Sequence, residues 1–301
     1  MPATNDLPDI LETTEAERLA TGFTFTEGPL WHPEGFYYFV DLRANKLYRI
    51  TPGQKPEFVR ETREGNGTTF DLQGRLIHCE GAGRCVTRLN HDGKVETIAE
   101  RYMGGRFNRP NDVVCRSDGS IFFTDPAKRV AYSKREIPPP EGINNLWDGA
   151  AVYRIAPEGS VSMVANCEYP NGLAFSPDER TLYVANTRSS KYIHALEIDV
   201  GGNMVRRRIF ADLNEGDEPG IPDGMKVDTQ GRVFCTGPGG VWVLSPEGKH
   251  IGTIRFPEQA VNFAFGGPDL RTLFCCAHTS VYTLRVKVPG QPHPWYRLRA
   301  K

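Results

Sequence analysis

One short motif recurs six times along the chain and limits what the chain can fold into. Each copy consists of a polar residue, a small or polar residue and an apolar run, as in Asn171-Gly172-Leu173-Ala174-Phe175. The leading polar residues of the six copies are Glu27, Asn66, Asn111, Asn171, Asp223 and Asn262. Six copies of one pattern are typical of a repeat protein, in which each unit packs against its neighbours.

A turn signal follows each copy at a fixed distance. In four copies a glycine stands eight positions after the leading residue, at Gly35, Gly74, Gly119 and Gly231. The other two copies have Pro177-Asp178 and Pro268-Asp269 near that position, and these are equally good turn formers. Since a run of β-branched and aromatic residues comes after every turn, each repeat is predicted to open with a β-hairpin.

Further strand patterns complete the repeats. A third apolar run follows in all six copies and a fourth in five of them, and successive copies begin 39 to 60 residues apart. Units of this size and strand density are typical of propeller blades. We therefore predict an all-β fold, a six-bladed β-propeller of four-stranded antiparallel blades, with residues 1–301 forming a single domain.

The sixth copy ends after its third strand. We expect residues 16–24 to supply the missing strand, because this closure leaves no open sheet edge. In the third copy, residues 126–149 exceed the repeat and form an insertion between its second and third strands, which we expect to shape a binding mouth. Helix is limited to a turn or two, expected over residues 11–19.

The charge balance argues against several classes of partner. The formal net charge is −1, whereas nucleic acids and anionic membranes select basic surfaces. The first twenty residues contain five carboxylates and no apolar stretch, so we expect no signal peptide and a cytoplasmic protein. No obligate protein partner is indicated. The seven cysteines form an odd number without CxxC spacing, and we expect free thiols.

The six leading residues are all polar, although they stand where the inner strand of each blade begins. In a propeller these strands line the central channel, so the six side chains are expected to converge around its axis. Two ionised carboxylates buried together cost several kcal/mol per ion unless a cation or hydrogen-bond donors compensate them. The side chains offer only oxygen ligands, which favours Ca²⁺, with Mg²⁺, Mn²⁺ and Zn²⁺ as alternatives.

Glu27, Asn171 and Asp223 are the expected ligands of this ion. Asn111 stands on the border between a ligand and a substrate contact, whereas Asn66 and Asn262 are expected to hold neighbouring side chains or water. The alternative is a purely structural ring, because Asn and Asp commonly start strands and cap turns. The common position of these residues in all six copies favours the metal site.

Four segments resemble those of the gluconolactonase, regucalcin and luciferin-regenerating enzyme family, and the likeness extends over about residues 20–288. The segments are TEGPLW at 26–31, NRPND at 108–112, YPNGLAFS at 169–176 and IPDGM at 221–225. The resemblance implies a six-bladed propeller with one catalytic divalent metal in the channel and, in many members, the hydrolysis of sugar lactones.

The resemblance also implies roles for individual residues. It makes Glu27, Asn171 and Asp223 the metal ligands and Asp223 the proton acceptor and donor as well. Arg109 and Asn111 match the substrate-binding pair of the family.

The function that follows is a metal-dependent hydrolase that opens the ester bond of a lactone. The metal would polarise the carbonyl group and Asp223 would act as general base, with a water activated by the ion as the competing base. Two alternatives stay open: a phosphotriesterase that uses the same site, and a non-catalytic binding propeller with a structural ion. The sequence lacks the G-x-S-x-G, H-E-x-x-H and P-loop motifs of other enzymes.

Overall fold

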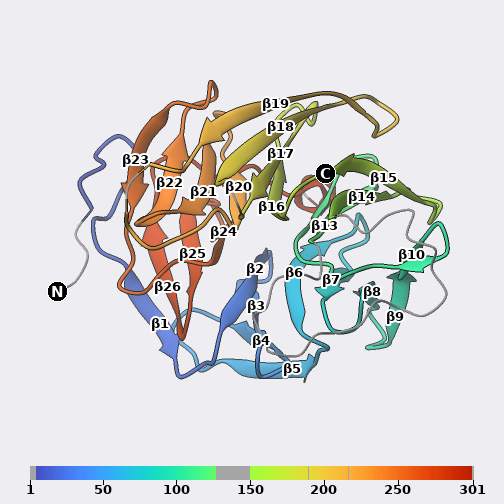
Figure 1. Cartoon of the computed structure of the whole chain (residues 1–301). Helices are drawn as coiled ribbons and strands as arrows, with labels where there is room; N and C mark the ends of the chain where they lie inside the picture. The colour runs from blue at the N-terminus through green and yellow to red at the C-terminus, as the bar shows by residue number, and fades with distance from the viewer. Residues whose placement is uncertain (1–4, 127–149, 189, 216, 300–301) are drawn as a thin grey trace.

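The computed structural model describes residues 5–126, 150–188, 190–215 and 217–299, and its sheets form a ring (Figure 1). Six of the sheets have four strands each, which confirms the predicted all-β, six-bladed propeller. The first three blades contain β2 (Thr26–His32), β3 (Phe36–Asp41), β4 (Lys46–Ile50), β5 (Glu57–Glu61); β6 (Gly65–Phe70), β7 (Leu76–Glu80), β8 (Cys85–Leu89), β9 (Val95–Ala99); and β12 (Val113–Cys115), β13 (Ile121–Asp125), β14 (Ala151–Ile155), β15 (Val161–Asn166). The next three contain β16 (Pro170–Phe175), β17 (Thr181–Asn186), β18 (Tyr192–Ile198), β19 (Met204–Asp212); β20 (Met225–Val227), β21 (Val233–Gly237), β22 (Gly240–Leu244), β23 (His250–Ile254); and β24 (Asn262–Gly266), β25 (Thr272–Ala277), β26 (Ser280–Arg285), β1 (Glu17–Thr21).

Each blade opens with the predicted hairpin and continues outward in antiparallel order. In the first blade the order is β2-β3-β4-β5, and the other blades repeat it. A small extra hairpin, β10 (Arg101–Tyr102) and β11 (Gly105–Arg106), follows the second blade. The insertion predicted at 126–149 falls between β13 and β14, and its residues 127–149 lie outside the described part of the chain.

The N-terminal strand closes the ring, as predicted. β1 pairs with β26 in antiparallel register, from Glu17 opposite Thr283 to Thr21 opposite Ser280. The prediction of a helical turn over residues 11–19 is wrong. Leu11 forms an isolated antiparallel bridge with Val286 instead, because the backbone groups of this segment find partners along the chain that follows β26.

Hydrophobic side chains fill the spaces between neighbouring blades. Among the described residues there are six apolar clusters, and each contains side chains from two adjacent blades. Between the sixth and first blades, for example, Phe274 stacks on Tyr37 with ring centroids 4.2 Å apart. All seven cysteines are free, as expected, and six of them are buried, where a thiol packs as a small apolar group.

Glycine in the motif allows neighbouring inner strands to approach closely. The backbone N of Gly172 donates to the carbonyl oxygen of Asp223 at 3.0 Å, and a Cβ atom on Gly172 would lie 1.9 Å from that oxygen. A Cβ on Gly28 would lie 2.2 Å from the carbonyl oxygen of Asn66. The Asn-Gly and Glu-Gly pairs of the sequence therefore mark places where a side chain has no room.

The Gly172→Ala variant is expected to lose about 1–3 kcal/mol of unfolding free energy, the usual cost of overpacking, because β16 must move away from Asp223. Thermal and denaturant unfolding measure this loss. Gly81→Ala is a matched control, since the nearest heavy atom to a Cβ there is 3.5 Å away. Equal stability of the two variants would contradict this explanation of the motif.

The C-terminal segment covers the end of the channel that lies opposite the leading residues. α1 (Pro294–Arg299) starts with proline, which suits the first helical position. The Trp295 ring packs on Phe70 with centroids 4.7 Å apart, and the Tyr296 hydroxyl donates to the carbonyl of Trp31. The sequence did not predict this helix, because the segment has no counterpart in the repeats. Within the described part of the chain, no helix has the length and apolar content needed to cross a membrane.

Candidate active site

The leading residues of the six repeats stand at or just before the start of the inner strands, which surround the centre of the ring (Figure 1). They therefore belong to one end of the channel. Backbone contacts join neighbours, as Gly172 N does with Asp223 O, and side chains link the last blade to the first. There the Asn262 Nδ2 donates to Glu27 Oε2 at 2.9 Å. The two residues are 235 positions apart in sequence, so the closure of the ring creates this contact.

Access to solvent differs around the ring. Glu27 and Asn171 are 2% and 5% exposed, whereas Asp223 is partly exposed. Of these three residues, Asp223 is therefore the one with the greatest contact with solvent.

Negative charge accumulates in the channel. Burial, then the charge of Glu27 and then that of Asp112 raise the pKa of Asp223 well above its ordinary value. Burial, followed by the charge of Asp112, also raises the pKa of Glu27. The Lys226 ammonium opposes both shifts. Among these described groups, three carboxyl groups face one ammonium, and a divalent cation would balance the charge that remains when the carboxyl groups ionise.

The amide of Asn171 is held in a fixed orientation. Its Nδ2 donates to Thr187 Oγ1 at 3.0 Å, and its buried Oδ1 has no hydrogen-bond donor among the described residues. A buried carbonyl oxygen without a donor is costly, so this oxygen, with the carboxylates of Glu27 and Asp223, fits an oxygen-preferring cation. The described residues contain no group of three or more His, Cys, Asp or Glu side chains that could hold a metal, and the set proposed here has two carboxylates and one amide.

Arg109 and Asn111 lie on the segment that leads into β12. The carboxylate of Asp125, at the end of β13, accepts from Arg109 N at 2.7 Å and from Asn108 N at 2.8 Å. Burial raises the pKa of Asp125 to about 7. The Arg109 guanidinium donates through Nη2 to Glu64 Oε2 at 2.6 Å. Backbone and side chain of Arg109 are thus both anchored at the mouth.

The three remaining amides of the ring differ in their contacts. Asn262 orients Glu27, which fits the expectation that it holds a neighbouring side chain. The Asn66 Oδ1 is buried and, like that of Asn171, has no hydrogen-bond donor among the described residues. The backbone N of Asn111 donates to the carbonyl of Thr124 at 2.8 Å, and its side chain is partly exposed.

Two channel residues were not assigned from the sequence. Asp112 is 4% exposed, and its Oδ2 lacks a hydrogen-bond donor among the described residues. Lys226 Nζ donates to the Met225 carbonyl at 2.9 Å and to Asn262 Oδ1 at 3.4 Å, and it lines a 140 Å³ cavity between the ring and the C-terminal segment. The sequence signal that could have identified Lys226 is its position, a lysine inside the apolar run of the fifth repeat.

Comparison with known proteins identifies the family. The model of the SMP-30/Gluconolactonase/LRE-like region matches residues 25–279. A gluconolactonase of Zymomonas mobilis is 30% identical over 92% of this chain and 83% of its own, and a 6-deoxy-6-sulfogluconolactonase of Pseudomonas putida is 27% identical over 90% and 94%. The solved structure of a gluconolactonase from Xanthomonas campestris has 31% identity and a TM-score of 0.84, with 95% of each chain covered. This chain therefore belongs to the SMP-30/gluconolactonase/LRE-like family.

Proposed function

We propose that this protein is a lactonase that opens sugar lactones or related cyclic esters with a bound divalent ion. The observation that carries the proposal is the convergence of Glu27, Asn171 and Asp223 in a channel where, among the described groups that act on one another, three carboxyl groups outnumber the Lys226 ammonium. The relatives named as gluconolactonase and sulfogluconolactonase support a lactone over a phosphotriester, and an enzyme over a binding module.

Glu27, Asn171 and Asp223 would hold the ion through oxygen atoms, which favours Ca²⁺, with Mg²⁺, Mn²⁺ and Zn²⁺ as alternatives. When bound, such an ion polarises the lactone carbonyl and offsets the negative charge that develops on its oxygen. Asn262 orients the Glu27 carboxylate, and Thr187 orients the Asn171 amide. These hydrogen bonds would hold the ligand oxygen atoms in position before the ion binds.

Asp223 is the general base of the proposal. Its carboxylate takes a proton from water while the water oxygen bonds to the carbonyl carbon, and it returns that proton to the ring oxygen when the C–O bond breaks. Arg109 and Asn111 offer donors to the substrate hydroxyl groups. The product is a hydroxy acid, which ionises at neutral pH and releases one proton per bond cleaved.

Proton release from a panel of uncharged lactones tests the proposal, with a phosphotriester as comparison substrate. We expect kcat/KM of roughly 10⁴–10⁸ M⁻¹ s⁻¹ for the best lactone and a much lower value for the triester. Heat-unfolded protein gives the spontaneous rate. Hydrolysis of the triester in preference to every lactone, or no lactone hydrolysis above the spontaneous rate, would contradict the proposal.

A further inference from the structure

Glu64 forms an ion pair with Arg109 at the mouth of the channel. The Arg109 Nη2 lies 2.6 Å from Glu64 Oε2, and the two side chains are 40% and 37% exposed. Because Asp125 also holds the backbone of Arg109, the guanidinium and the Glu64 carboxylate meet at a fixed place that a substrate can reach.

The backbone of Glu64 is constrained in an unusual conformation. Its φ angle is 52°, in the left-handed region that residues other than glycine seldom adopt. Its N–H donates to Asn45 Oδ1 at 2.7 Å, and its carbonyl accepts from Gly81 N at 2.9 Å. Such a conformation persists where the surroundings determine it, and it is frequent at functional sites.

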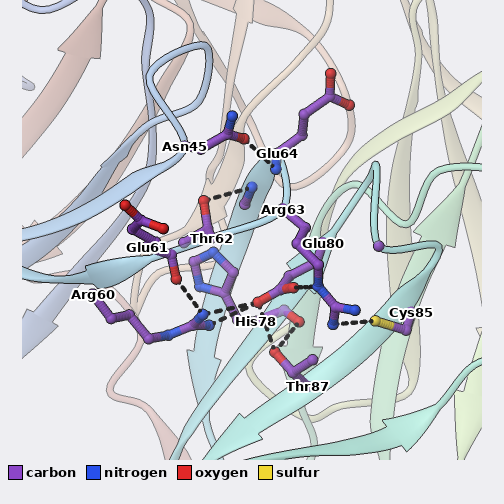
Figure 2. A network of polar contacts seen from close by, with 12 residues as sticks. Asn45, Arg60, Glu61, Thr62, Arg63, Glu64, His78, Glu80, Cys85 and Thr87 are labelled. Atoms are coloured by element: carbon purple, nitrogen blue, oxygen red, sulfur yellow. Dashed lines mark hydrogen bonds and ion pairs between the residues drawn. The ribbon is translucent and has the colours of Figure 1, made fainter.

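Asn45, whose side chain accepts from the Glu64 N–H, also has a left-handed backbone, with a φ angle of 58°. Figure 2 shows the Asn45 side chain in contact with the backbone of Glu64, and the Glu64 carboxylate directed away from the polar network on the other side of the turn. The side-chain direction of Glu64 therefore follows from how its backbone is held.

A buried network anchors the other side of the same turn. The Glu80 carboxylate is buried, and it accepts from Arg63 Nε at 2.6 Å and from Arg60 Nη1 at 2.9 Å (Figure 2). The Thr62 Oγ1 accepts from Gly65 N at 3.1 Å. Arg63 is thus bound to the network, while its neighbour Glu64 is left to face Arg109.

The pairing has a consequence for the charge of the mouth. A carboxylate, phosphate or sulfonate group that approached Arg109 would meet the negative charge of Glu64 at the same place. A neutral hydroxyl can accept a hydrogen bond from the guanidinium without displacing Glu64, because the fork has five N–H donors and the ion pair engages it through Nη2.

We propose that Glu64 is a specificity-determining residue that makes the site favour uncharged lactones over lactones that carry an anionic group. This inference rests on the proposed lactonase function. Glu64 acts in two ways: it holds the Arg109 guanidinium in place, and its own carboxylate repels an anionic group on the substrate.

The Glu64→Gln variant tests the inference, since glutamine keeps the size of the side chain and removes its charge. The probes are D-glucono-1,5-lactone and its 6-phosphate, and the measured quantity is the ratio of their kcat/KM values. We expect the ratio to shift towards the phosphate on the order of tenfold, and the shift to shrink at high salt, where charges are screened. Glu61→Gln is the matched control, because this exposed residue loses the same charge three positions away.

The outcomes separate this inference from the function on which it rests. An unchanged ratio in Glu64→Gln, with the neutral lactone still hydrolysed, would overturn the role of Glu64 and leave the lactonase proposal standing. An equal shift in Glu61→Gln would also overturn it, because the effect would then be one of general charge. If the wild-type protein hydrolysed neither lactone, the proposed function itself would fail.

Discussion

The Asp223→Asn variant is expected to hydrolyse lactones with a kcat/KM about 10²–10⁴-fold below that of the wild type, the usual contribution of a general base. An amide cannot take the proton of the attacking water. The substitution also removes one of the two carboxylates proposed to hold the ion, so the affinity for the ion is expected to fall as well. Initial rates of proton release, measured at saturating Ca²⁺, give the effect on catalysis.

Asp228→Asn is the matched control for this variant. Asp228 belongs to the same inner hairpin, but its buried carboxylate pairs with Arg232 Nε at 2.5 Å. Its loss is expected to lower thermal stability and to leave the activity of the folded protein near the wild-type value. Full activity of Asp223→Asn would rule out Asp223 as the base.

Binding of a divalent ion is expected to stabilise the fold. At a free ion concentration 100 times Kd, the stabilisation amounts to about 2.7 kcal/mol. For a chain of this size that corresponds to a rise in Tm of roughly 4 °C. Thermal unfolding of chelator-treated protein, with and without added Ca²⁺, measures the shift.

The stabilisation of the fold by the ion is expected to increase with pH. Because burial raises the pKa of Glu27 above its ordinary 4.5, the ion-free folded protein binds more protons than the unfolded chain. Its stability therefore falls as pH rises above about 4.5, where the unfolded chain ionises first. A bound ion favours the ionised carboxylates, so its stabilising effect should be larger at pH 8 than at pH 5.

Glu27→Gln distinguishes this explanation from general salt effects. The variant should be more stable than the wild type when both are ion-free at pH 8, because a buried charge is absent. It should also gain less from Ca²⁺. A Tm shift that is the same in Glu27→Gln and wild type would show that the ion acts elsewhere.

Local sequence was sufficient to predict the blades. Turn residues such as Gly35 and Gly74 stand at a fixed distance from the leading residue, and each hairpin joins strands that are close in sequence. The closing strand followed from the missing fourth strand of the last repeat, and β1 confirms it. Periodicity therefore predicts this fold well, because every blade repeats the same pattern of turn residues and apolar runs.

Segments outside the repeat were not predictable in the same way. Residues 11–19 looked compatible with a helical turn, but Leu11 bridges to Val286, 275 positions away. The α1 segment packs on Phe70 and Trp31, which are equally remote in sequence. Partners of this kind come from tertiary structure, and no local pattern encodes them.

In the candidate site, too, the residues inside the repeat pattern were predictable and the others were not. The six leading residues were selected from their common position in the repeats, and the resemblance to the family assigned Glu27, Asn171 and Asp223 as ligands. These roles stay predictions. Lys226 stands three residues after the leading position of its repeat, and Glu64 two residues before that of its own, so neither shares the position on which the selection depended. The pairing of Glu64 with Arg109 spans 45 positions and appears only in the folded chain.

The most direct test is to remove divalent ions from the protein with a chelator and then titrate Ca²⁺ back, while binding is followed by calorimetry and lactone hydrolysis by proton release. We expect one ion per chain and an activity that rises in proportion to the occupied fraction. Full lactone hydrolysis by protein that elemental analysis finds free of divalent metal would contradict the account.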